Sequence, residues 1–252
     1  MRTCCFALLA GVCGMAASAR VAAEDFRIDN RVYATGQSRP DSQSSTIFYS
    51  GAVYDFLEDP SEVIVLDKSG GRFVLLELGR RVQTELTKDL VATLTAKIKE
   101  KAAGSPIPLV QFRGDPKFEE KFDESAFKLT LASDWMTYQV QVQSPGAAIA
   151  QQVREFSDWN ARLNAMLNPG SWPFARLLLN EALARHQATA REVRLTVTSK
   201  KTSPARQTTV RSQHDLVLKL TPADVNRVAQ AREFMRTFPA IDFGKYRQSP
   251  GR

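Results

Sequence analysis

The sequence predicts an α+β protein built on a single curved antiparallel sheet, half-barrel-like, with amphipathic helices packed over one face. Short segments of alternating apolar and polar residues follow one another through turns too short for parallel crossovers. Segments with the helical period of 3.6 residues interrupt them. No linker rich in Pro, Gly or Ser divides the chain and no repeat is evident, so we expect one domain over residues 24–238.

The first 23 residues predict a signal peptide. Residues 4–19 form an uncharged run behind Arg2, too short to cross a bilayer core of ~30 Å. We favour cleavage after Ala23, because a strand pattern starts directly afterwards, over cleavage after Ala19. An uncleaved anchor and a lipid-modified Cys13 are alternatives, and Val12 argues against the second. We expect a periplasmic or secreted protein with no transmembrane segment in the mature chain.

The predicted signal contains every cysteine of the chain: Cys4, Cys5 and Cys13. The mature chain is therefore expected to be cysteine-free, without disulfides, thiolate metal sites or a cysteine nucleophile. The net charge is +7, and loss of Arg2 and Arg20 with the signal leaves +5. This excess is mild and lies in small clusters, so it gives no support to nucleic-acid binding.

The first half of the mature chain is predicted to form an antiparallel meander. Residues 25–32 alternate as a half-buried strand, and residues 36–45 are polar and predict an exposed loop. Ser50-Gly51 predicts a two-residue hairpin turn. The strands that follow the loop are expected at residues 46–49, 52–56, 62–66, 72–76 and 80–85.

Helices and further strands make up the second half. Thr87 is expected to cap a helix that Gly104 ends, and Ser171 to cap another. Thr221-Pro222-Ala223-Asp224 combines a cap, a proline at the first helical position and an acid that completes the cap. The remaining expectations are a loop at 106–116, strands at 118–122, 127–131, 136–142, 193–197 and 209–220, a helix at 147–167, and a flexible tail at 239–252.

The search for catalytic chemistry yields no site. His186 ends a predicted helix and His214 lies within a predicted strand, and their spacing does not match a metal-binding pair, so we expect structural roles for both. Two acidic groups lack an EF-hand pattern and are interpreted as solvated loops. They comprise Asp55, Glu58 and Asp59, and Glu119, Glu120, Asp123 and Glu124. We therefore assign no catalytic, cofactor-binding or metal-binding residue and expect no cofactor.

One apparent set of enzyme motifs is rejected. Ser125-Ala126-Phe127-Lys128, Ser133-Asp134 and Lys201-Thr202-Ser203 follow the order of penicillin-binding enzymes. In those enzymes the serine and lysine lie one helical turn apart, whereas here they enter a strand pattern. The second element also follows too closely to leave room for a helical domain.

The stretch from Thr46 to Leu86 resembles a family of exported bacterial proteins of uncharacterised role, through Ile47-Phe48-Tyr49, Val53-Tyr54-Asp55-Phe56 and Arg72-Phe73-Val74-Leu75-Leu76. The order of strands and helices also loosely resembles the lipoprotein-carrier (LolA-like) class. That resemblance implies an unclosed half-barrel with helices across its concave face and acyl chains held between them. No diagnostic motif is shared, so the resemblance assigns no functional residue.

These observations lead to two main functional expectations. The first is an exported, non-enzymatic envelope protein that binds a lipid, lipoprotein or other apolar ligand in its half-barrel. The second is a structural or protein-interaction module of the envelope whose core is filled. A hydrolase is a distant third, which convergence of polar residues in a pocket would favour.

Overall fold

The computed structural model describes residues 24–199 and 206–248, so the predicted signal peptide at 1–23 lies outside the described residues. Eleven strands form one open antiparallel sheet in the order β6-β5-β4-β3-β2-β1-β11-β10-β9-β8-β7, and this confirms the predicted fold class. The strands are β1 (Phe26–Tyr33), β2 (Ser42–Tyr49), β3 (Ala52–Leu57), β4 (Glu62–Asp67), β5 (Arg72–Glu77), β6 (Val82–Thr87), β7 (Glu119–Asp123), β8 (Lys128–Ala132), β9 (Met136–Gln143), β10 (Thr189–Ser199) and β11 (Arg206–Val217).

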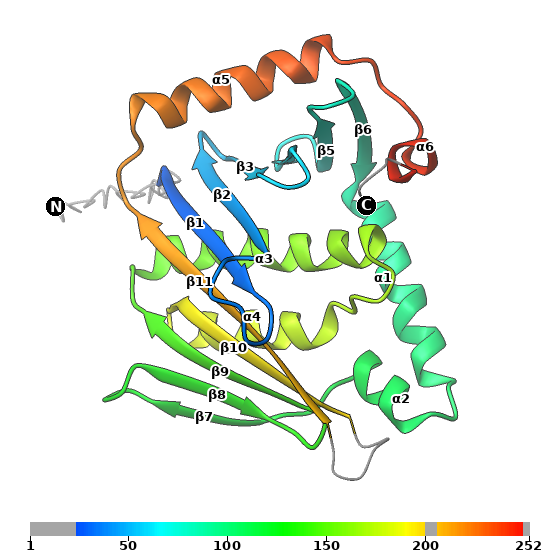
Figure 1. The fold of residues 1–252 in the computed structure, drawn as a ribbon, viewed down its shortest axis with the longest axis vertical. Coiled ribbons are helices and arrows are strands. Elements are labelled where there is room, and N and C mark those ends of the chain that lie inside the picture. Colours follow the sequence, from blue (N-terminus) through cyan, green and yellow to red (C-terminus); the bar gives the residue numbers. More distant parts are fainter. Residues whose placement is uncertain (1–23, 200–205, 249–252) are drawn as a thin grey trace, which may run out of the picture.

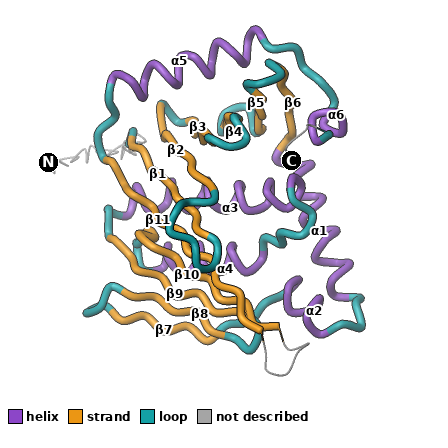
Figure 2. Tube along the Cα trace, viewed as in Figure 1, coloured by secondary structure: helices purple, strands orange, loops and turns teal. Residues whose placement is uncertain are grey.

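Six helices accompany the sheet in the described part of the chain. Figures 1 and 2 show α3 and α4 side by side across one face of the sheet, with α5 on its own at the other end of the molecule. None of the helices within 24–199 and 206–248 has the length and apolar character needed to span a membrane. The helices are α1 (Lys88–Ala103), α2 (Pro108–Gly114), α3 (Ala147–Leu167), α4 (Phe174–Arg185), α5 (Pro222–Thr237) and α6 (Phe243–Arg247).

The centre of the sheet joins segments from opposite ends of the chain. β1 pairs with β11 in a register that runs from Arg27 opposite Val217 to Tyr33 opposite Arg211. This long-range pairing joins the N-terminal meander, β1–β6, to the C-terminal strands β7–β10 (Figure 1). Residues at the middle of the sheet therefore come from both ends of the sequence.

Two separate apolar cores fill the face covered by α3 and α4. The larger core joins β1–β6 to α1, α3 and α6, with Phe26 and Phe48 stacked at a ring-centroid distance of 4.2 Å. The smaller core joins β8–β10 to α4, around Leu129, Val140 and Leu179. The boundary between the two cores crosses β1, β2 and β11, and a cavity lies there.

Helix α5 packs against the opposite, convex face of the sheet. Its Val228 and Ala231 cover Ile47, Val65 and Val74, all fully or almost fully buried. A helix packs on this face because β4 and β5 have apolar side chains on both faces, and both faces must be buried. The helix starts at a complete capping box between Thr221 and Asp224, as the sequence predicts.

The prediction of a flexible tail from Pro239 is wrong for residues 239–248. The Gln83 amide donates to the Pro239 carbonyl at 3.0 Å, and Ile241 donates back to Gln83 at 2.8 Å. Tyr246 in α6 is 0% exposed, and its hydroxyl donates to Glu62. The segment has no period because a few aromatic and backbone contacts, rather than a helical stripe, attach it to the edge strand β6.

Three local predictions also differ from the structure. The loop expected at 106–116 contains α2, because Pro108 takes the first helical position, where its missing N–H costs nothing. The loop expected at 36–45 ends at Ser42, where β2 begins. Ser171 does not cap α4, since its hydroxyl accepts from Asn164 and the cap position is Pro173. The predicted Thr87 cap and the Ser50-Gly51 turn are confirmed.

Candidate functional site

The boundary between the two cores contains a cavity of about 230 Å³. Its floor is the concave face of β1, β2, β3 and β11, and its roof is formed by α3 and α4. Apolar walls come from Ile28, Phe48, Val153, Phe156 and Leu183. On the floor, the side chains that point inward from the strands change from apolar to polar. The sheet and the helices therefore do not pack tightly here, as they do in the two apolar cores on either side.

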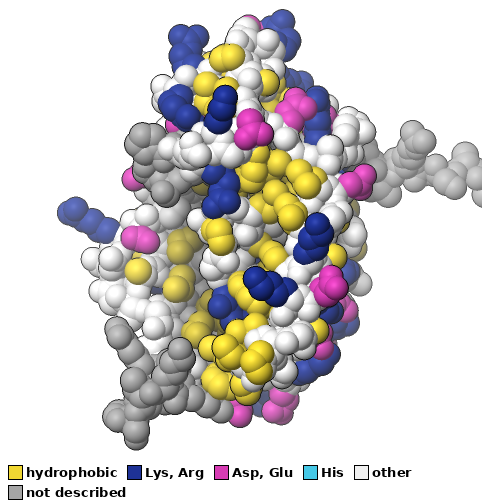
Figure 3. Space-filling view, turned by 90° about the vertical axis from the view of Figure 1, so that its right-hand side faces the viewer, with side chains coloured by type: hydrophobic (Ala, Val, Ile, Leu, Met, Phe, Trp, Pro, Cys, Tyr) yellow, Lys and Arg dark blue, Asp and Glu magenta, His cyan; other side chains and the backbone are white. Residues whose placement is uncertain are grey.

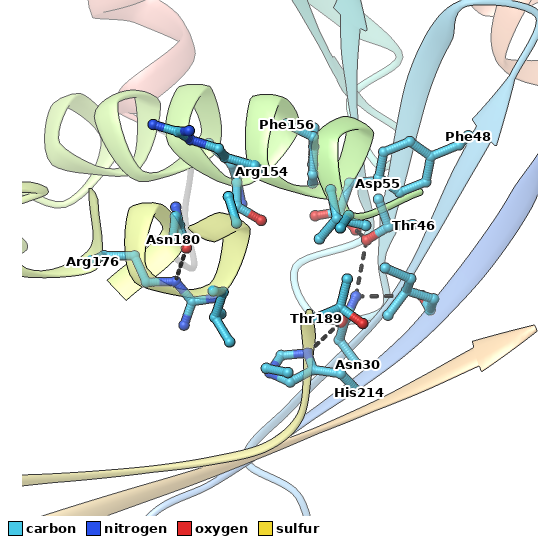
Figure 4. Close-up of a pocket in the computed structure, with 18 of the residues that line it drawn as sticks. Asn30, Thr46, Phe48, Asp55, Arg154, Phe156, Arg176, Asn180, Thr189 and His214 are labelled. Atoms are coloured by element: carbon cyan, nitrogen blue, oxygen red, sulfur yellow. Dashed lines mark hydrogen bonds between the residues drawn. The ribbon is translucent and has the colours of Figure 1, made fainter. Parts of the chain in front are cut away.

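The polar floor is a continuous chain of hydrogen bonds across four neighbouring strands. The Ser212 hydroxyl lies 2.9 Å from His214 Nε2, and His214 Nδ1 lies 2.8 Å from Asn30 Oδ1. The Asn30 amide donates to Thr46 Oγ1 at 2.9 Å, and Thr46 donates to Asp55 Oδ1 at 2.8 Å. Since Asn30 Oδ1 can only accept, Nδ1 of His214 holds the proton and Nε2 accepts from Ser212. Figure 4 shows the part of this chain from His214 to Thr46.

Burial sets the charge state of the two titratable groups in this chain. Desolvation, with a smaller contribution from the positive charge of Arg176, lowers the pKa of His214 to about 3. The imidazole is therefore neutral at pH 7. Desolvation also raises the pKa of the Asp55 carboxyl, although its hydrogen bonds from Thr46 and Ser44 act in the opposite direction. Asp55 is 7% exposed and has no ion pair with another described residue.

The roof contributes two arginines, Arg154 from α3 and Arg176 from α4. Arg176 Nε donates to Asn180 Oδ1 at 3.1 Å, and Asn180 Nδ2 donates to Asp158 Oδ1 at 2.9 Å. Arg154 lies 3.8 Å from the same Asp158. Figure 4 shows the Arg176 side chain extending from α4 into the space between helices and sheet. Desolvation lowers the pKa of Arg176, but a guanidinium keeps its proton under all ordinary conditions.

A second cavity of about 570 Å³ adjoins the first. Ser157, Asn160, Arg176 and His214 line both cavities, so they mark the junction. The second cavity continues along α3 and α4 toward β9 and β10. Its apolar lining includes Val32, Met136, Tyr138, Trp172, Val193 and Leu195. Together the two spaces fall in the range of ligand pockets, about 300–1,000 Å³.

The histidines and acidic residues considered as candidates from the sequence lie in different places. His214 lies at the cavity junction, whereas His186 sits at the surface end of α4, 3.1 Å from Glu120. The acidic side chains of Asp55 and Glu58 do not point to one site. Asp55 is buried in β3, so its interpretation as part of a solvated loop is wrong. Glu58 is exposed and accepts a hydrogen bond from Gln43. Within 24–199 and 206–248, no group of three potential ligands is placed to hold a metal ion.

The enzyme-like motifs do not assemble either. Ser125 lies in an exposed turn and bonds to Asp123, and Lys128 begins β8 on the exposed side. The third element, Lys201-Thr202-Ser203, lies outside the described residues. Comparisons with protein-family models and with curated proteins find no match to this chain. Function is therefore inferred from the cavity residues themselves.

Sequence reasoning missed Asn30, Thr46, Arg176 and Thr189 as site residues. A signal was nevertheless present in two of them. Asn30 occupies an inward position of an otherwise apolar alternation, after Phe26 and Ile28 and before Val32. Arg176 lies within the buried stripe of α4, one turn before Leu179 and Asn180. A polar residue at a position where the period requires an apolar one indicates a lined cavity or a buried polar network.

Proposed function

We propose that this protein is an exported, non-enzymatic binding protein of the cell envelope that holds one small amphiphile between the concave sheet face and helices α3 and α4. The main support is the pair of adjoining cavities, whose walls are apolar and whose junction is polar. Binding sites for small molecules combine mostly apolar walls with a few placed polar groups. Export is inferred from the N-terminal sequence pattern.

The cavities favour binding over a structural module with a filled core. Protein interiors are normally packed to crystal-like density, and voids larger than a water molecule are few. Two adjoining spaces of about 230 Å³ and about 570 Å³ that open to solvent are therefore expected of a binding site and not of a filled core. The protein-interaction alternative has its own support on the face that α1 and α2 occupy. Hydrophobic side chains lie there among lysines and arginines (Figure 3), and Ile107 is 55% exposed.

A hydrolase is a second candidate because Ser212, His214 and Asn30 have the spacing of a nucleophile, base and orienting group. The electrostatics argue against it. A general base works best when its pKa lies near the working pH, and the pKa of His214 is about 3. Ser212 also lies in regular β11 and not at an exposed, sharp turn. We therefore interpret the three residues as the polar floor of a binding site.

A fluorescence titration with the neutral probe N-phenyl-1-naphthylamine tests the binding function. We expect the mature chain to bind about one probe molecule. Ala184→Trp places an indole into the cavity from α4 and should weaken probe binding at least tenfold. Ala147→Trp, at the exposed start of α3, is the matched control and should bind as the wild type does. The proposal fails if the wild type binds no probe, or if the two variants bind it equally well.

A further inference from the structure

Arg176 has hydrogen-bond donors that the protein itself does not use. A guanidinium offers five N–H donors in a planar fork. Only Nε of Arg176 is bonded, to Asn180 at 3.1 Å. The two terminal nitrogens make no hydrogen bond and no ion pair with any residue in 24–199 or 206–248. Both cavities are lined by this side chain, so its free donors lie at their junction.

Neither acidic group that acts on Arg176 neutralises its charge. Burial lowers the pKa of Arg176 more than Tyr138 and Asp158 raise it, and the Asp158 carboxylate is already bonded by Asn180 and approached by Arg154. Asp55 is on the opposite wall and bonds to Thr46. Arg176 is half-buried and lines both cavities. Its planar fork of donors matches the geometry of a carboxylate or a phosphate.

A second polar group without a partner lies in the wall of the same space. The hydroxyl of Thr189 is buried and has no hydrogen-bond partner, and the residue is 3% exposed. Buried hydroxyls are nearly always bonded, so an unpartnered one in a cavity wall indicates a missing partner. Figure 4 places Thr189 beside Asn30 and His214, on the side of the cavity opposite Arg176.

We propose that the ligand carries an anionic head, a carboxylate or a phosphate monoester, which Arg176 binds through its terminal nitrogens and to which Thr189 donates its hydroxyl. This inference rests on the proposed binding function and adds the chemical class of the ligand. The apolar walls around Phe48, Val153 and Phe156 then hold the tail. A bidentate contact between guanidinium and anion uses both terminal donors. Neutral His214 adds no competing charge.

Isothermal titration of the mature chain with three C12 probes, each below its micelle concentration, tests the proposal. The probes are dodecanoate, dodecyl phosphate and dodecanol. We expect at least one anion to bind about 10- to 100-fold more tightly than dodecanol, as charged hydrogen bonds typically provide. Whether dodecanoate or dodecyl phosphate is preferred identifies the head group. Arg176→Met should remove the preference, so that neither anion binds more tightly than dodecanol.

Two further variants make the result interpretable. Arg154→Met removes the other arginine of the roof, which lies 3.8 Å from Asp158, and should lower the preference for the anion far less than Arg176→Met does. Thr189→Val keeps the shape of the side chain and should reduce anion affinity severalfold, and more than it reduces dodecanol affinity. Equal affinity of the wild type for all three probes would overturn the anionic head while leaving the binding function intact. Binding of none of the three would contradict the binding function itself.

Discussion

The buried imidazole of His214 should make the stability of the protein fall as the pH falls below 7. Its pKa is 6.5 in the unfolded chain and about 3 in the folded protein. Between these values the unfolded state binds the proton and the folded state does not, so stability is full above pH 6.5 and is lost toward pH 3. Each pH unit inside the window costs about 1.4 kcal/mol. From pH 7 to pH 5 the loss due to this residue is about 2 kcal/mol.

His214→Gln isolates this effect, because glutamine can accept from Ser212 and donate to Asn30 but does not titrate. Urea unfolding at pH 7, 6 and 5, followed by circular dichroism, gives the free energy of unfolding for each protein. We expect the wild type to lose about 2 kcal/mol more than His214→Gln across this range. His186→Gln removes the surface histidine, keeps His214, and should retain the loss. Equal losses in wild type and His214→Gln would refute a buried, neutral imidazole.

Variants at four further residues test other parts of the structure. Asp55→Asn should raise the melting temperature at pH 7, because burial raises the pKa of this carboxyl and its ionisation therefore costs stability. The gain should shrink toward pH 4, and each unit of pKa difference corresponds to about 1.4 kcal/mol. Lower stability of the variant at every pH would contradict this. Thr221→Ala should cost about 1 kcal/mol in urea unfolding, since it removes the capping box of α5, and Thr221→Ser should restore it. Tyr246→Ala should cost about 3–5 kcal/mol, as for other buried aromatics, whereas a frayed tail would tolerate it at no cost. Ser212→Ala should leave any hydrolysis of p-nitrophenyl esters at the wild-type background, and loss of activity in this variant would support the hydrolase alternative.

The fold could be predicted from local patterns because most of its elements have strong local signals. The alternation in β1 and β9, the caps at Thr87 and Thr221 and the Ser50-Gly51 turn all depend on neighbouring residues. The polar start of β2 gave no such signal, since its inward Ser44 lines the cavity instead of a core. The position of α5 on the convex face follows from strands that are apolar on both sides, a feature visible in β4 but compatible with more than one covering element.

The candidate site could not be assembled from the sequence, because its residues meet only through long-range strand pairing. Asn30 and His214 are neighbours across β1 and β11 although 184 residues separate them along the chain. Arg176 comes from α4, which packs over the boundary between the two cores, and no spacing in the sequence predicts that contact. Periodicity shows on which face of a strand a residue lies, but the order of the strands in the sheet decides which residues become neighbours on that face.

Native mass spectrometry of the protein, purified from its own host without detergent, tests the central claim most directly. A cavity that holds an amphiphile with an anionic head at Arg176 should give a species heavier than the polypeptide by one small molecule. Release of that molecule should yield a carboxylate or phosphate ion in negative mode, and Arg176→Met should lose most of it. A mass equal to the bare polypeptide, together with a densely packed, ligand-free interior in a crystal structure of the same preparation, would contradict the claim.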